Sequence, residues 1–112
     1  MPTLTAPTLN DPALGEMVRR LVEIYKPQRI YLFGSAARGE AGPDSDYDFM
    51  VVVADDTPTE QRRSGRAHKA LWRLGRAADV LVYRKTVFDE QLHLKASLPS
   101  TIVREGKLLY AE

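Results

Sequence analysis

Two aspartates separated by a single residue have the clearest chemical meaning in this sequence. Asp46 and Asp48 lead into an apolar run at residues 49–53, which is typical of a β-strand. Side chains alternate along a strand, so both carboxylates fall on one face, where they repel each other unless a cation lies between them. Oxygen ligands suit Mg²⁺ or Mn²⁺ better than zinc. The pair therefore predicts a divalent-cation site, with a solvated strand entry as the alternative.

A third aspartate, Asp79, stands in the same relation to a second apolar run. It precedes residues 80–83 as Asp48 precedes residues 49–53. A parallel connection through the intervening segment would bring both strand starts to one edge of a sheet. Asp46, Asp48 and Asp79 would then converge as metal ligands. A simple turn residue is the alternative interpretation of Asp79.

A glycine–serine pair follows another apolar run, residues 29–33. Gly34 lets the backbone approach a ligand closely, and the amides that open the next helical turn form an anion site to which Ser35 adds a hydroxyl. Arg38, one turn later, can hold a phosphate oxygen or neutralise charge that develops during transfer. An ordinary strand-to-helix turn and a surface salt bridge are the alternatives. For Gly34 to reach the aspartates, strand 29–33 must run antiparallel to strand 49–53.

Helices are expected around these strands. Asp11 and Pro12 start a helix that Pro27 ends, and Thr57 with Glu60 has the spacing of a capping box, which predicts a long helix to about residue 77. Shorter helices are expected at residues 86–95, capped by Thr86 and Asp89, and at residues 98–104, ended by Gly106, before a last edge strand at residues 107–110. Together these elements predict an α+β fold of two-layer type. Its mixed sheet has strand 29–33 antiparallel to strand 49–53, which is parallel to strand 80–83.

Length and composition set limits on the class of protein. A chain of 112 residues suits one domain, expected at residues 11–112 after a flexible tail at residues 1–10. The absence of cysteine excludes disulfides, thiolate zinc sites and cysteine nucleophiles. A net charge of +1 gives no field that would imply nucleic acid or membrane binding, and no apolar run approaches the ~20 residues that span a bilayer. We therefore expect a cytoplasmic protein.

The predicted long helix carries one basic face. Its members recur at three- and four-residue steps: Arg62, Arg66, Lys69, Arg73 and Arg76. A solvated surface is the usual explanation, with an acidic protein partner or RNA as the alternative. RNA is not assigned on this pattern alone. Trp72 lies off both the basic and the apolar stripes, and His68 and His93 are interpreted as surface residues because neither has a second metal ligand at suitable spacing.

Taken together, these motifs resemble the DNA polymerase beta-type nucleotidyltransferase superfamily. The resemblance rests on Gly34-Ser35, Arg38-Gly39, Ser45-Asp46-x-Asp48 and Asp79-Val80-Leu81-Val82. Within the superfamily the chain is similar to the minimal nucleotidyltransferase branch, from the first helix to Tyr110. The resemblance implies that Asp46 and Asp48 bind two Mg²⁺ ions, that Asp79 binds one of them and helps to activate the attacking hydroxyl, and that Gly34 and Ser35 grip a nucleoside triphosphate.

The same resemblance implies a reaction and a partner. Minimal nucleotidyltransferases commonly act as antitoxins beside a HEPN-domain ribonuclease toxin and can transfer AMP from ATP to a tyrosine hydroxyl of that toxin. We therefore expect a protein adenylyltransferase with Mg²⁺ or Mn²⁺ and ATP, in a homo- or hetero-oligomer. Two alternatives remain: a non-catalytic module that neutralises its partner by contact, and transfer to a small molecule such as an aminoglycoside by a homodimer.

Overall fold

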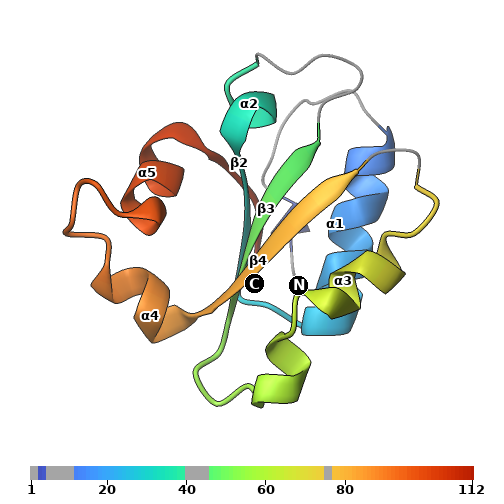
Figure 1. The fold of residues 1–112 in the computed structure, drawn as a ribbon, viewed down its shortest axis with the longest axis horizontal. Helices are drawn as coiled ribbons and strands as arrows, with labels where there is room; N and C mark the ends of the chain where they lie inside the picture. The colour runs from blue at the N-terminus through green and yellow to red at the C-terminus, as the bar shows by residue number, and fades with distance from the viewer. Residues whose placement is uncertain (1–2, 5–11, 40–45, 75–76) are drawn as a thin grey trace.

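A mixed β-sheet forms the centre of the protein (Figure 1). The computed structural model describes residues 3–4, 12–39, 46–74 and 77–112. The sheet order is β1-β5-β2-β3-β4. The strands are β1 Thr3–Leu4, β2 Arg29–Phe33, β3 Tyr47–Val53, β4 Ala78–Arg84 and β5 Lys107–Ala111. As predicted, β2 runs antiparallel to β3, and β3 runs parallel to β4.

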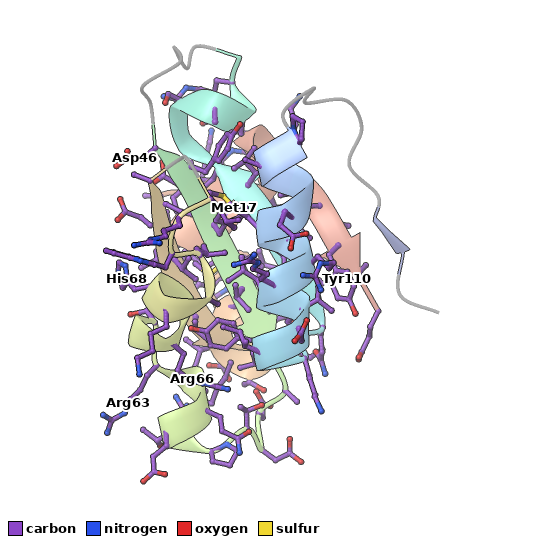
Figure 2. All side chains as sticks on the ribbon, turned by 90° about the vertical axis from the view of Figure 1, so that its right-hand side faces the viewer. Met17, Asp46, Arg63, Arg66, His68 and Tyr110 are labelled. Carbon is purple, nitrogen blue, oxygen red and sulfur yellow. The ribbon has the colours of Figure 1, made fainter. Side chains whose placement is uncertain are left out.

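Helices cover both faces of this sheet (Figures 1 and 2). The helices are α1 Pro12–Tyr25, the single turn α2 Gly34–Ala37, the 3-10 helix η1 Thr59–Arg62, α3 Gly65–Ala70, α4 Lys85–Glu90 and α5 Leu98–Glu105. One face packs against α1 and α3, and the other packs against α4 and α5, which add a second helical layer. No helix in the described part of the chain is long and apolar enough to cross a membrane.

Strand β3 is apolar on both sides because it lies between two cores. Phe49 and Val51 belong to the core beneath α1 and α3, whereas Met50 and Val52 belong to the core beneath α4 and α5. All four are fully buried. An unbroken apolar run is the pattern expected for a strand covered on both faces. The two cores hold β3 firmly, and its first residues carry the predicted carboxylates.

Helix α1 follows its sequence pattern closely. Its buried residues, Leu14, Met17, Val18, Leu21 and Tyr25, form one apolar stripe toward the sheet. The helix ends where Lys26 adopts a left-handed conformation (φ 47°), followed by Pro27, which cannot continue it.

The predicted long helix at residues 57–77 is wrong. The segment forms η1 and then α3, separated by an extended Arg63, and α3 ends at Ala70. Two side chains of α1 hydrogen-bond to backbone carbonyls of this segment. The Tyr25 hydroxyl donates to Arg63 O (2.6 Å), and Arg20 Nη1 donates to Ala70 O (2.9 Å). Tertiary contacts therefore favour a broken path over the continuous helix that local pattern predicts.

The capping box at the start of this segment is not formed either. Pro58, not Thr57, precedes η1, and it makes no side-chain cap hydrogen bond. Arg62 instead reaches back, with Nε donating to Thr57 O (3.0 Å) and Nη2 to Thr59 Oγ1 (2.9 Å). The arginine side chain supplies the donors that a regular helical turn would have supplied.

Other local predictions also need correction. Helix α4 stops at Glu90, and its expected caps bond elsewhere: Thr86 donates to Asp55 through both its amide and its hydroxyl, and Asp89 accepts from Arg29. Strand β5 is not an edge strand, because Thr3–Leu4 of the expected tail pair with it as β1. Sequence pattern does not show these long-range partners.

Candidate active site

The starts of β3 and β4 lie side by side and carry one predicted carboxylate each. In the parallel register Asp48 is the partner of Asp79. Across the antiparallel pair, Phe33 is the partner of Asp48, so the next residue, Gly34, begins α2 beside that carboxylate. The structure thus brings three elements that are distant in sequence to one edge of the sheet, as predicted.

Gly34 lies in direct contact with Asp48. Its φ is +75°, a left-handed conformation that side chains rarely adopt. A Cβ atom added here would overlap Asp48 Oδ2 and lie 3.3 Å from Asp48 Cγ. Only glycine lets the backbone turn this close to the carboxylate, which gives Gly34 a positional role beyond that of an ordinary turn.

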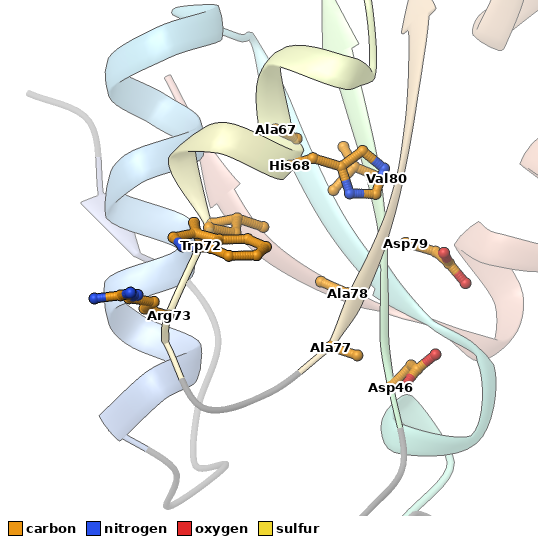
Figure 3. A pocket seen from close by; sticks show the side chains of 10 residues that line it. Asp46, Ala67, His68, Trp72, Arg73, Ala77, Ala78, Asp79 and Val80 are labelled. Atoms are coloured by element: carbon orange, nitrogen blue, oxygen red, sulfur yellow. The ribbon is translucent and has the colours of Figure 1, made fainter.

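The carboxylates share one face of the sheet. Asp48 alternates with Phe49 and so lies on the face of Met50 and Val52, the α4/α5 side, and the register places Asp79 on that face as well. Asp46 and Asp79 are exposed, whereas Asp48 is partly buried. Figure 3 shows the carboxylates of Asp46 and Asp79 on the same side of the first residues of β4.

The pKa of Asp48 reflects the closeness of these charged groups. Burial raises its pKa, the negative charges of Asp79 and Asp46 raise it further, and the guanidinium of Arg38 lowers it. The three carboxylates and Arg38 therefore lie within electrostatic reach of one another. A bound cation would relieve the excess negative charge at Asp48.

The three carboxylates suit Mg²⁺, which keeps water and phosphate ligands, better than a metal ion whose ligands all come from the protein. Within the described residues, no three acidic or histidine side chains are gathered closely enough to enclose a metal ion. Mg²⁺ usually keeps waters and substrate phosphate oxygens among its ligands and takes only one or two carboxylates from the protein. Asp46, Asp48 and Asp79 lie at one open edge, where one or two of them could bind an ion while water and phosphate oxygens supply its other ligands.

Helix α2 places the predicted phosphate ligands. Ser35 is its second residue and partly buried, and Arg38 is its exposed C-cap. With one turn only, α2 offers backbone amides and side chains to an anion rather than a sizeable helix dipole. Ser45, the remaining residue of the motif, lies outside the described residues.

The predicted basic face is not a single surface. Arg66 Nη1 donates to Gln61 O (3.0 Å) and its guanidinium stacks over the ring of Tyr25, while Arg62 binds the loop before η1. In Figure 2, Arg66 and Arg63 lie toward the end of the molecule away from Asp46. Arg76 lies outside the described residues. Two of the face's cations thus stabilise the local fold.

A cavity beside the carboxylates was not predicted from the sequence. It has a volume of about 400 Å³, and its wall includes Asp46, Asp79, His68, Leu71 and Trp72. Figure 3 shows His68 and Trp72 on one side of the start of β4 and both carboxylates on the other. His68 is exposed, as interpreted from the sequence, and it also lines this cavity. The one signal in the sequence was Trp72, which fits neither the basic nor the apolar stripe of the predicted long helix.

Comparison with protein families assigns the chain. The model of the nucleotidyltransferase domain matches residues 14–109, which include all six predicted site residues. The chain belongs to the nucleotidyltransferase domain family. No functionally curated protein matches this nucleotidyltransferase significantly.

Two of the solved structures of similar fold are toxin–antitoxin structures. A crystal structure of a toxin–antitoxin with AMP-PNP matches with a TM-score of 0.58 and 27% identity, covering 88% of this nucleotidyltransferase and 73% of that chain. A mutant of the MntA-HpeT toxin–antitoxin matches with a TM-score of 0.57 and 23% identity, over the same shares. The second match shows the fold alone.

Proposed function

We propose that this nucleotidyltransferase transfers AMP from ATP to a hydroxyl of a partner protein, and that it thereby neutralises a HEPN-type ribonuclease toxin. The observation that carries the proposal is the contact between Gly34 and Asp48 at the edge shared with Asp79. It joins a phosphate-binding turn to a carboxylate cluster in one site. The similarity to a toxin–antitoxin crystallised with AMP-PNP supports the choice of nucleotide and partner.

Each residue has a part in this reaction. Asp46, Asp48 and Asp79 would hold Mg²⁺, which when bound neutralises the triphosphate and eases ionisation of the acceptor hydroxyl. Gly34 and Ser35 bind the phosphates that leave as pyrophosphate. Arg38, near enough to act on the charge of Asp48, offsets negative charge at the leaving group.

The bond changes follow an in-line displacement. The acceptor oxygen forms a bond to the α-phosphorus while the bond from that phosphorus to the bridging oxygen of pyrophosphate breaks. Asp79 takes the proton of the acceptor hydroxyl. Its place at the start of β4, next to Asp48 but one strand farther from Gly34, suits a group that faces the acceptor rather than the leaving phosphates.

Mass spectrometry tests the proposal. The purified chain is mixed with MgATP and a candidate HEPN-type toxin, the product of the reading frame adjacent to its own gene. We expect the toxin to gain the mass of at least one AMP group, and the Asp48→Asn variant to add none. An unmodified toxin in the wild-type reaction would refute the proposal.

The same variants separate transfer from simple contact. If the chain acts by contact alone, Asp46→Asn still suppresses the ribonuclease activity of the toxin at equal protein concentration. If transfer is required, Asp46→Asn leaves the ribonuclease active, although the two proteins still bind each other. Ribonuclease assays with and without ATP distinguish the two cases.

A further inference from the structure

The cavity beside β4 contains a tryptophan whose side chain is largely in water. Trp72 is 70% exposed and lines the cavity together with His68 and Leu71. An exposed indole is unusual in a monomeric protein and is common where another molecule binds. A volume of about 400 Å³ lies in the usual range for ligand sites. The cavity is therefore large enough to receive a side chain and its adjoining backbone.

The strand order and the lining residues show which strand this cavity adjoins. From β2 across the sheet, the order is Gly34 at the end of β2, Asp48 on β3 and Asp79 on β4, and the cavity adjoins the start of β4 on the side of α3. The cavity thus adjoins β4, which is the strand farther from Gly34, whereas β3 lies between β4 and the turn at Gly34.

The geometry of in-line displacement relates this order of residues to the direction from which the acceptor hydroxyl approaches. The attacking oxygen and the leaving pyrophosphate occupy opposite positions about the α-phosphorus. If the leaving phosphates lie at Gly34 and Ser35, the acceptor hydroxyl must approach from the side of Asp79. The cavity is the hollow on that side, and its wall includes Asp79 itself.

The start of β4 leaves a passage from the cavity to the carboxylates. Two alanines, Ala77 and Ala78, lie between Trp72 on one side and Asp46 with Asp79 on the other (Figure 3). Their methyl side chains are small, so they leave little obstruction between the cavity and the carboxylates. A peptide segment bound in the cavity can therefore reach over the strand toward Asp79.

We infer that this cavity docks the acceptor segment of the partner protein, with an aromatic side chain of that segment against Trp72 and the acceptor hydroxyl next to Asp79. This inference rests on the proposed function. It assigns His68 and Trp72 to acceptor binding and not to the nucleobase. Binding there delivers the hydroxyl, and the bond changes at phosphorus are those given above.

Fluorine NMR reports on the cavity directly. Trp72 is the sole tryptophan of the chain, so protein labelled with 5-fluorotryptophan gives one signal. We expect the unlabelled candidate toxin to shift this signal and Mg²⁺ with AMP-PNP alone to leave it in place. A shift caused by AMP-PNP alone would assign the cavity to the nucleobase, and no shift with toxin would remove the docking site. Either result overturns the inference.

Kinetics of three variants complete the test. Trp72→Ala should raise the KM for the toxin roughly 3- to 10-fold, the loss expected for one aromatic contact, and leave the KM for ATP unchanged. Trp72→Phe should restore most of the loss. Leu94→Ala is the control, because Leu94 is also exposed (51%) but does not line the cavity.

These readouts separate the inference from the proposed function. If wild-type protein shifts the fluorine signal with toxin but adds no AMP, the proposed function fails while the docking surface remains. If AMP is added and Trp72→Ala has a normal KM for toxin, the proposed function stands and the docking assignment is wrong.

Discussion

Asp48 and Asp79 are directly paired residues of two parallel strands, and the charge of Asp79 raises the pKa of Asp48. The pairing explains why two aspartates 31 positions apart act as one group: the register of β3 and β4 leaves them no other relative placement. Gly34, which follows the antiparallel neighbour β2, contacts Asp48 from the other side.

Gly34→Ala should damage both fold and activity. The added Cβ meets Asp48 Oδ2, and alanine is strained at φ +75°, so we expect a loss of about 3 kcal/mol in the free energy of unfolding. Gly39→Ala is the matched control, since Gly39 has the same φ but no atom within 4 Å of an added Cβ. It should cost only about 1 kcal/mol. Equal losses in urea denaturation of the two variants would argue against the contact.

Asp48→Asn should make the metal-free protein more stable at neutral pH. Burial and the neighbouring carboxylates raise the folded-state pKa of Asp48 above its ordinary value of 3.8, so folding favours the protonated form. That contribution is fully present below pH 3.8 and is lost as pH rises through the raised value. We expect the Tm of the wild type in EDTA to fall below that of Asp48→Asn over this interval. Parallel Tm profiles of the two proteins would contradict the prediction.

Asp79→Asn should lower AMP transfer by a factor on the order of 10² to 10⁴, the range for loss of a positioned acid–base group. Asp56→Asn is a suitable control, because Asp56 is exposed beyond the other end of β3. Its rate should stay within about twofold of the wild type. Circular dichroism checks that both variants are folded, and comparable rates for the two would exclude Asp79 from the reaction.

Asp89→Ala should destabilise the side of the sheet covered by α4. Arg29 Nη2 donates to Asp89 Oδ1 (2.9 Å), and the same guanidinium lies 5.2 Å from the ring centre of Phe88, which stacks on Tyr31. With allowance for solvent screening, the loss should be about 1 kcal/mol. Glu90→Ala, at the exposed next position, should change little.

Acid should reveal the same contact. Burial opposes ionisation of Asp89, but its hydrogen bonds with Arg29 and Lys85 outweigh that effect and lower its pKa. Its contribution is present above the ordinary value and is lost as pH falls through the lowered folded-state pKa. The stability difference between wild type and Asp89→Ala should therefore shrink in acid. A constant difference down to low pH would show that ionised Asp89 is not involved.

Gly106→Ala should be among the most damaging single changes. Its added Cβ would lie 2.6 Å from both Ile102 O and Leu32 O, and backbone oxygens cannot move aside as a flexible side chain can. We expect a loss of about 3 kcal/mol in the free energy of unfolding. Gly15→Ala on α1, where the space is open, should instead stabilise by up to about 1 kcal/mol. Thermal melting of both variants tests the contrast.

Sequence pattern predicted the carboxylate edge well because each part depends on short-range rules. Alternation placed Asp46 and Asp48 on one face, and apolar runs marked all three central strands. Gly106 illustrates the limit. It does end α5, but with φ −86° and not a left-handed turn, and glycine is needed there because β2 passes close by. No local pattern reports such an approach.

The cavity could not be predicted because it results from the failure of a local rule. A continuous helix at residues 57–77 would have set Trp72 at a fixed angle to the apolar stripe. The observed chain leaves α3 at Ala70, where Arg20 of α1 binds the last carbonyl, and only then places Trp72 beside β4. A contact between residues 50 positions apart thus decides where the tryptophan lies.

The aspartates and the cavity come largely from different parts of the chain, and this separation affects how such domains can diversify. The edge that carries the three aspartates is built from β2, β3 and β4, whereas α3 and the turn after it, which supply His68 and Trp72, come from the connection between β3 and β4. Substitutions or insertions in this connection can change what the enzyme meets without disturbing the register of Asp48 and Asp79. Natural selection can therefore alter the surface beside the aspartates by changing this one segment, while the sheet stays the same.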